Sequence, residues 1–261
     1  DFDARIMAQK IHGFRDMKKY RRHRLLGCIA VLIAAVILLN LEVTTKQGVN
    51  YEVHAIKIPL YLKLLDFFDR HYNYEVLVKK ITSGAGSDED KAMKILEWTC
   101  KNIKDNPKEL PVIDDHVWHI IVRGYGVDDQ FQDVFTTLCN YANLNAFYYE
   151  VHSETGGGRK PLSFVRLGDR WAIFDVYNGA YFVNKNGQIA GIGDLYRGDW
   201  KAVSITKRET PDYYDRYFKT LNSINFKKWW LSRGAIQSPV RRFIYFIKRP
   251  TETERSPVEA R

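Results

Sequence analysis

The most uneven feature of the 261-residue chain is an uncharged apolar run near its beginning. From Leu25 to Leu41 no residue is charged, and Asn40 is the only strongly polar one. A helix that crosses a bilayer needs about 17–25 such residues, so this run lies at the short end of the range. The pattern predicts a membrane-spanning helix over residues 25–41.

The charges on either side of this run predict its orientation. Seven basic residues lie between Lys10 and Arg24, whereas Glu42 follows the run. Because basic flanks stay in the cytoplasm, residues 1–24 are expected to form a cytoplasmic arm and the main domain to lie in the periplasm. A cleaved signal peptide would need a small-x-small site, which "LLNLEVTT" lacks, and a core helix would not need the basic flank. We interpret the segment as a signal anchor of a bacterial inner membrane, with Arg21, Arg22 and Arg24 as contacts to lipid headgroups or to a partner protein.

Residues 42–86 are predicted to connect the anchor to the main domain. The segment "EVTTKQGVNYEVHAIKIP" (42–59) alternates as a stalk or a strand would. Residues 60–72 predict a short helix, and the glycine-rich "SGAGS" at 83–87 marks the start of the main domain. The residues that this short helix places on one face are Leu60, Leu64, Phe67 and Phe68.

Two helices are predicted at the start of the main domain. Ser87 followed by "DED" is typical of a helix N-cap with acidic residues in the first turn. The first helix is expected over about 88–104 and the second over about 129–143. The residues expected on their buried faces are Ala92, Leu96, Thr99 and Ile103 in the first helix, and Val134, Leu138 and Ala142 in the second.

After residue 145 the pattern changes to that of strands. The segments "AFYYEVH", "LSFVRLG", "RWAIFDVY" and "AYFVN" are rich in aromatic and β-branched residues and are separated by turn residues. They predict an antiparallel meander of four or five strands. Helices followed by such a sheet define an α+β domain, here over residues 87–207.

Residues 208–261 are predicted to form a helix, a basic aromatic strip and a tail. Thr210 and Pro211 suit the start of a helix that carries Tyr214, Phe218 and Leu221 on one face. In the strip, rings alternate with cations, which suits a lipid headgroup layer or a docking contact with a partner protein. The residues expected to make these contacts are Trp229, Trp230, Arg241, Arg242, Phe243 and Tyr245.

The net charge of +9 lies at the two ends of the chain. Residues 1–24 carry +5, residues 227–249 carry +7 and residues 250–261 carry −1, so the central residues 25–226 carry −2. A nucleic-acid-binding domain would carry its positive charge on the folded part, so no nucleic acid partner is expected. The three cysteines, Cys28, Cys100 and Cys139, are too few and too scattered for a disulfide framework or a zinc site, and we expect unpaired, mostly buried thiols.

Three stretches carry a family resemblance: "KAMKILEWTCKNIK", "RGYGVDDQFQDVFTTLCNYANLNAFYYEV" and "LSFVRLGDRWAIFDVYNG". Together they resemble the bacterial transglutaminase-like domain of the papain-type superfamily, in which helices pack on an antiparallel sheet. The chemistry of that family uses a Cys-His-Asp arrangement. The cysteine begins a helix, whose dipole stabilises its thiolate. The histidine accepts the thiol proton, and the aspartate orients the histidine.

The resemblance implies that this chain lacks the nucleophile. The family's "G-V-C-D" matches residues 126–129, so Asp128 stands in the place of the cysteine. Trp171 and Asp175 match the tryptophan and the orienting aspartate, which are both retained. An acid at position 128 is expected to cap free N–H groups of the helix instead, a contribution of about 0.5–2 kcal/mol.

The resemblance implies that the histidine is lost as well. Leu162 is its best match, and Lys160 is the next if the register shifts. No catalytic residue is therefore expected, and we predict a pseudoenzyme. Cys139 lies three turns along the same helix, too far to replace the nucleophile, and is expected in the core. His152, on a nearby strand, is the residue that could still approach the cleft at the family's active-site positions.

No metal or cofactor is expected. His116 and His119 could share one helix face, but an i,i+3 pair alone is a weak metal signal. The acidic residues that could gather near the helix start do not have the spacing of a calcium site. They are Asp128, Asp129, Asp133 and Asp175.

These observations favour a non-catalytic, single-pass membrane subunit or scaffold. Its exported domain would bind and stabilise a larger integral-membrane complex, either energy-transducing (photosynthetic or respiratory) or part of the cell envelope. One alternative is an active, cysteine-independent envelope hydrolase or acyltransferase, which would require an open cleft with His152 within reach of Asp175. Another is a ligand- or glycan-binding module that uses exposed tyrosines of "YYEV" and "DVYNGAYF".

Overall fold

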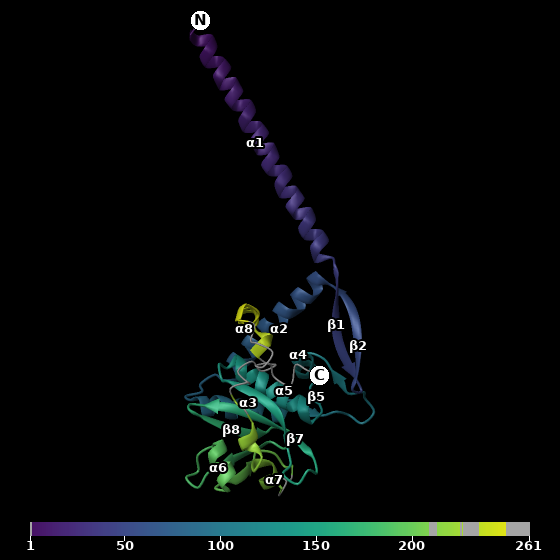
Figure 1. The fold of residues 1–261 in the computed structure, drawn as a ribbon, viewed down its shortest axis with the longest axis vertical. Helices are drawn as coiled ribbons and strands as arrows, with labels where there is room; N and C mark the ends of the chain where they lie inside the picture. The colour runs from purple at the N-terminus through teal and green to yellow at the C-terminus, as the bar shows by residue number, and fades with distance from the viewer. Residues whose placement is uncertain (1, 209–212, 225, 227–234, 249–261) are drawn as a thin grey trace. The chain divides into compact units, whose positions relative to one another are not determined.

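The computed structural model of the chain describes residues 2–208, 213–224, 226 and 235–248 (Figure 1). The chain divides into two compact units. The first comprises residues 1–45 and 55–66, and the second comprises residues 46–54 and 67–261. The expected contact residues Trp229 and Trp230 lie outside the described residues.

The first unit is dominated by helix α1 (Phe2–Leu39), which joins the expected arm and the expected spanning segment in one helix (Figure 1). Its stretch Arg21–Leu39 is long and apolar enough to cross a membrane, and none of that stretch is buried within the protein. The helix ends at Leu39, after which the Asn40 side chain donates to the backbone oxygen of Val36 at 2.8 Å. Arg21 is exposed, as are Arg22 and Arg24.

Residues 42–59, expected as a stalk or a single strand, form two strands. These are β1 (Glu42–Val49) and β2 (Glu52–Pro59). Asn50 and Tyr51 between them have φ values of 49° and 67°, the left-handed backbone that a two-residue hairpin turn requires at both positions. The end of β1 also pairs with the short strand β4 (Ile113–Asp114), so the three strands form a small sheet in the order β2-β1-β4.

Helix α2 (Leu60–Ile81) is longer than the short helix expected over 60–72, and it contributes to the core of the second unit. Tyr74 and Val78 are buried there, so the hydrophobic core begins before residue 87. Helix α3 (Asp88–Asn102) starts as predicted, because Ser87 is its N-cap and accepts from the backbone N–H of Asp90 at 3.0 Å. The four residues predicted for its buried face, Ala92, Leu96, Thr99 and Ile103, are all buried.

A connection of short elements leads from α3 to the next long helix. It contains β3 (Lys104–Asp105), α4 (Val117–Arg123) and β5 (Tyr125–Gly126), and β3 pairs with β5 in parallel. Helix α5 (Asp128–Tyr141) follows, with Val134, Leu138 and the adjoining Ala142 buried as predicted. Every residue from Gln130 to Asn140 is buried, so α5 is enclosed on all sides, including its polar face.

The predicted meander is a five-stranded antiparallel sheet in the order β10-β9-β8-β7-β6. Its strands are β6 (Ala146–His152), β7 (Arg159–Leu167), β8 (Arg170–Asp175), β9 (Ala180–Val183) and β10 (Lys201–Ser204). Helix α6 (Ile192–Arg197) lies between β9 and β10 in the sequence. This arrangement of helices and antiparallel sheet confirms the α+β class.

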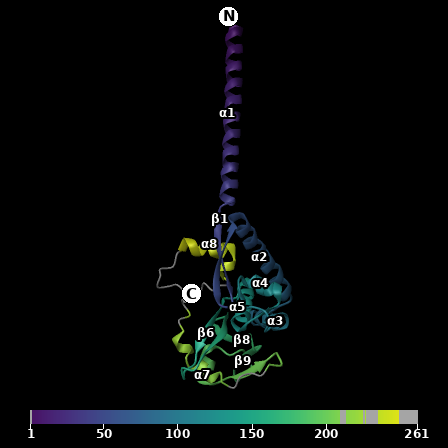
Figure 2. The same cartoon turned by 90° about the vertical axis from the view of Figure 1, so that its right-hand side faces the viewer.

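Alternating strand residues build a hydrophobic cluster on each face of the sheet. Val165 and Phe174 pack with residues of α2, α3 and α5 on one face. Leu162 and Phe164 pack on the other face, which α6, α7 (Asp215–Phe218) and the 3-10 turn η1 (Leu221–Ser223) cover. Figure 2 shows α3 and α5 on one side of the strands and α7 on the other. The turn η3 (Ala235–Gln237) and helix α8 (Pro239–Lys248) complete the described chain.

Candidate functional site

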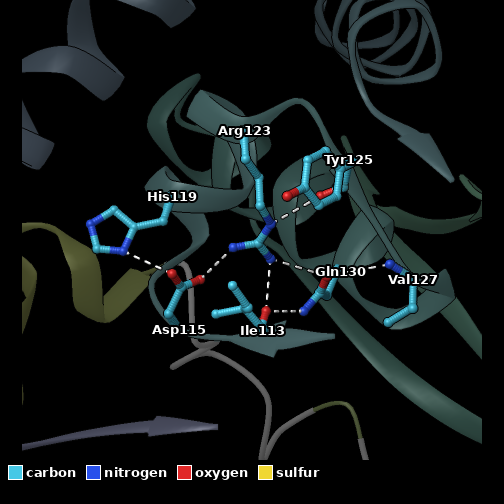
Figure 3. A network of polar contacts seen from close by, with 7 residues as sticks. All are labelled: Ile113, Asp115, His119, Arg123, Tyr125, Val127 and Gln130. Carbon is cyan, nitrogen blue, oxygen red and sulfur yellow. Dashed lines mark hydrogen bonds and ion pairs between the residues drawn. The ribbon is translucent and has the colours of Figure 1, made fainter. Parts of the chain in front are cut away.

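The start of α5 is held in place by a network of polar contacts centred on Arg123 (Figure 3). Arg123 donates to the carboxylate of Asp115 at 2.9 Å and to the backbone oxygen of Ile113 at 2.7 Å. Gln130 donates to the same Ile113 oxygen at 2.7 Å and accepts from the backbone N–H of Val127 at 3.3 Å. The segment before α5 is therefore fixed to its first turn.

Gly126 is needed in this segment because the backbone passes so close to Gln130. A Cβ atom at position 126 would lie 2.7 Å from the Gln130 side-chain oxygen. The "G-V-D-D" stretch thus enters the helix in a tight and well-supported turn, and the next residue after Val127 is Asp128.

Asp128 is the first residue of α5 and does not cap it, contrary to expectation. The N-cap is Val127, and the side chain that reaches back to the N-cap backbone is Gln130. The Oδ1 atom of Asp128 is buried and has no hydrogen-bond partner within the described structure. Burial raises the pKa of Asp128 to about 6, although the charge of Lys160 opposes this shift.

Lys160, the second candidate for the histidine position, lies at the site. Its Nζ atom is 3.0 Å from Oδ2 of Asp175, and the two side chains are 8% and 0% exposed. Burial alone would lower the pKa of Lys160, but the charges of Asp175 and Asp128 outweigh it and hold that pKa above its usual value. Leu162, the first candidate, is fully buried in the apolar cluster on the sheet.

Asp175 is held by two further side chains. The Tyr214 hydroxyl donates to its Oδ2 atom at 2.5 Å, and the Asn178 amide donates to the same atom at 2.8 Å. The backbone N–H of Asn178 donates to Oδ1 at 3.3 Å. Burial and the neighbouring Asp175 raise the pKa of Tyr214, so its proton stays on the hydroxyl at neutral pH. The carboxylate of Asp175 is thus fully engaged.

The other residues considered for catalysis, His152 and Cys139, do not contact the cluster of Asp128, Lys160 and Asp175. His152 is exposed, and Asp175 contacts the side chains of Lys160, Tyr214 and Asn178 instead. Cys139 is fully buried, and burial raises the pKa of its thiol well above its usual range. Among the described residues, no group of three His, Cys, Asp or Glu side chains is placed to hold a metal ion.

A cavity of about 300 Å³ lies close to the site, but neither Asp128, Lys160 nor Asp175 lines it. Its lining residues come from α3 and its C-cap, β3, α5, the turn after β8 and the segment after β10: Cys100, Ile103, Lys104, Phe131, Tyr177, Thr206, Lys207 and Arg208. The tyrosines expected to be exposed are half-buried instead: Tyr148, Tyr149, Tyr177 and Tyr181. Tyr177 lies beneath the guanidinium of Arg208, whose carbon is 4.3 Å from the ring centre.

Sequence reasoning missed Tyr214 and Asn178 as parts of the site. Asn178 could have been found, because it lies in the turn directly after β8, where asparagine is favoured and its amide can reach the aspartate that ends the strand. Tyr214 could not, because it is 39 residues from Asp175 and was expected only to pack on an apolar helix face.

The family model of the transglutaminase-like superfamily matches residues 75–176, which contain Asp128, Lys160 and Asp175. This part of the chain is a transglutaminase-like domain. A search of curated proteins found no match.

Three solved structures resemble the chain. A candidate cysteine protease from Cytophaga hutchinsonii has 16% identity and a TM-score of 0.35, with 59% of this chain and 60% of that chain covered. A candidate protease from Parabacteroides distasonis has 10% identity and a TM-score of 0.34, with 62% of this chain and 38% of that chain covered. A TGase has 9% identity and a TM-score of 0.34, with 66% of this chain and 47% of that chain covered. The chain therefore spans less than two thirds of each of these proteins.

Proposed function

We propose that this chain is a non-catalytic, single-pass membrane subunit whose transglutaminase-like domain serves as a binding surface for a larger integral-membrane complex. The observation that carries the proposal is the buried ion pair between Lys160 and Asp175. The resemblance matches Asp175 to the aspartate of the family's Cys-His-Asp arrangement, and Lys160 is the second candidate for the position of its histidine.

The chemistry of the pair argues against a catalytic role. A general base must be able to accept a proton at working pH. The pKa of Lys160 is raised by two carboxylates, so its ammonium keeps its proton at neutral pH. Asp175 accepts from three side chains and has no imidazole to orient. The pair is an internal brace between the strands rather than a proton relay.

Asp128 gives a similar argument. A carboxylate can act as a nucleophile only with an acid or base partner that processes the intermediate. The described structure offers a protonated ammonium and a second carboxylate beside it, and the nearby cavity is lined by other residues. These features support the proposal that the site has no catalytic function.

A face of α2 in the second unit supports the binding role. Phe68, Tyr72 and Val76 lie four residues apart and are 55%, 66% and 49% exposed. Such spacing puts them on one side of the helix, where large exposed apolar side chains commonly mark an interaction site. The exposed charged residues of the same helix have both signs, which suits a protein partner better than an anionic lipid surface: Asp69, Glu75, Lys79 and Lys80.

In this proposal α1 spans a bacterial inner membrane with its basic end in the cytoplasm, and the domain lies in the periplasm. The partner would belong to an energy-transducing complex, photosynthetic or respiratory, or to envelope machinery. Gentle detergent extraction of native membranes, native-gel separation and mass spectrometry of co-migrating proteins test it. A large, defined assembly with other membrane proteins is expected. Migration of the chain alone with its detergent would reject the subunit role.

A further inference from the structure

Helix α8 presents an apolar face to solvent. Val240, Phe243, Ile244 and Ile247 are 65%, 64%, 41% and 67% exposed. They are spaced at i, i+3, i+4 and i+7, so they share one side of this ten-residue helix. Four large apolar side chains grouped in this way are unusual on a surface that contacts only water.

The other side of α8 contacts the domain. The Arg241 guanidinium donates to the side-chain oxygen of Asn140 on α5 at 3.5 Å. The Arg242 guanidinium lies over the ring of Phe67, 5.3 Å from its centre. The Arg241 contact holds the helix with its apolar side turned outward, while Arg242 stays exposed beside that face.

We propose that α8 is an interfacial helix that lies in the headgroup layer of the bilayer that α1 would span, with Phe243 and Ile247 inserted among the acyl chains. This inference rests on the membrane anchoring in the proposed function and adds a second, peripheral attachment. The occupant of the apolar face is an anionic lipid surface.

Charge favours lipid over protein at this helix. From Pro239 to Lys248 the sequence has three basic residues and no acidic one. An amphipathic helix with basic residues beside an apolar face binds anionic headgroups while its apolar side chains enter the acyl boundary. The exposed apolar face of α2 differs, because Asp69 and Glu75 accompany it.

The length of the connection keeps such a contact within reach. Residues 40–45 join the end of α1 to the first residue of the second unit, and even a fully extended chain of that length spans only about 20–22 Å. A domain tethered so closely meets the bilayer at a high effective concentration, so a short helix with modest intrinsic affinity would stay bound.

A photocrosslinking experiment on the full chain tests the proposal. A benzoylphenylalanine in place of Phe243 is reconstituted in vesicles of phosphatidylcholine with and without phosphatidylglycerol, illuminated and analysed by mass spectrometry. The same probe in place of Tyr196 on α6, which is 49% exposed, is the matched control. We expect several-fold more lipid adduct at position 243 than at position 196, a larger yield with phosphatidylglycerol, and a lower yield at high salt.

Adducts at position 243 that contain protein, or a lipid yield no higher than at position 196, would overturn the proposal. A second variant, Val240→Ser with Ile247→Ser, changes only exposed positions and should lower the lipid yield at position 243 while the domain stays folded. The outcome is independent of the subunit role. If the chain migrates alone and gives lipid adducts, the interfacial role of α8 is supported and the subunit role is rejected. If the chain migrates in a native assembly and gives protein adducts, the subunit role is supported and the interfacial role of α8 is rejected.

Discussion

The Nζ atom of Lys160 lies 3.0 Å from the Oδ2 atom of Asp175, with both side chains almost completely removed from solvent. A buried ion pair of this kind stabilises little relative to an apolar pair, but either partner left alone is costly. In a transglutaminase-like domain this position would hold the catalytic base and its orienting acid. In the proposed function, this ion pair takes the place of the family's base and its orienting acid.

Replacing Lys160 with methionine is expected to destabilise the domain strongly. Asp175 would remain buried with an uncompensated charge, which costs about 3–5 kcal/mol, reduced by the donors from Tyr214 and Asn178 that stay in place. Thermal or urea unfolding of the detergent-solubilised full chain measures the loss. Lys185→Met is the matched control, because Lys185 pairs with Asp199 at the surface and its side chain is 78% exposed. Equal, small losses in both variants would show that the buried pair does not brace the sheet.

The hydroxyl of Tyr214 is expected to contribute through its hydrogen bond to Asp175. Tyr214→Phe removes a donor to a buried carboxylate and should lower the free energy of unfolding by about 1.5–3 kcal/mol. Tyr213→Phe is the control, because Tyr213 is 42% exposed and should lose much less. If the Tyr214→Phe chain is as stable as the wild type, the contacts from Asn178 and Lys160 are enough to stabilise the buried carboxylate of Asp175, and the prediction is wrong.

Much of the fold could be predicted from the sequence because local and global signals agree. The Ser87 cap, the helix starting near Asp129 and the four main strands each combine a turn signal with a clear periodicity. The hairpin over 42–59 was missed because its turn residues, Asn50 and Tyr51, are not the usual Asn-Gly pair. The full burial of α5 was also missed, since its polar residues suggested a solvent-exposed face.

The register of β7 explains why Lys160 was only the second choice. Pro161 interrupts the strand pattern, so the strand was expected to start at Leu162. In the structure β7 begins at Arg159, and Pro161 is paired with Glu150 of β6. On the other side of β7 the pairing with β8 begins only at Ser163, so the missing N–H of Pro161 breaks no hydrogen bond there. Single-sequence patterns do not reveal which edge of a strand is paired at each residue.

Asp128→Asn is expected to stabilise the domain at neutral pH. Burial raises the pKa of Asp128 from 3.8 to about 6, so the native state binds its proton more tightly than the unfolded state does. The stability of the wild type should therefore fall as pH rises from about 4 to about 6 through this group, by at most about 3 kcal/mol. The variant lacks this loss, so its advantage should grow over that range and stay constant above it.

Unfolding measured from pH 4 to pH 8 for both chains tests this prediction, and the difference between them removes the contribution of other groups. Asp129→Asn, at the neighbouring position in the first turn of α5, is the matched control. An advantage of Asp128→Asn that is the same at pH 4 and pH 7 would contradict the prediction.

The apolar face of α2 is expected to be needed for assembly. Phe68→Ser with Tyr72→Ser removes two exposed rings, so the fold should be kept while the amount of native assembly falls several-fold. Tyr196→Ser on α6 is the control. Unchanged assembly in the first variant would exclude this face as the partner contact.

The central claim is that the domain acts by binding and not by chemistry, and complementation tests it most directly. A strain lacking the gene is supplied with the wild-type chain or with Asp128→Asn, and the co-migrating assembly is quantified by native gel and mass spectrometry. The account predicts that the assembly is lost without the chain and restored equally by both, because the carboxylate at position 128 has no chemical role. An Asp128→Asn chain that folds and reaches the membrane but fails to restore the assembly would contradict it.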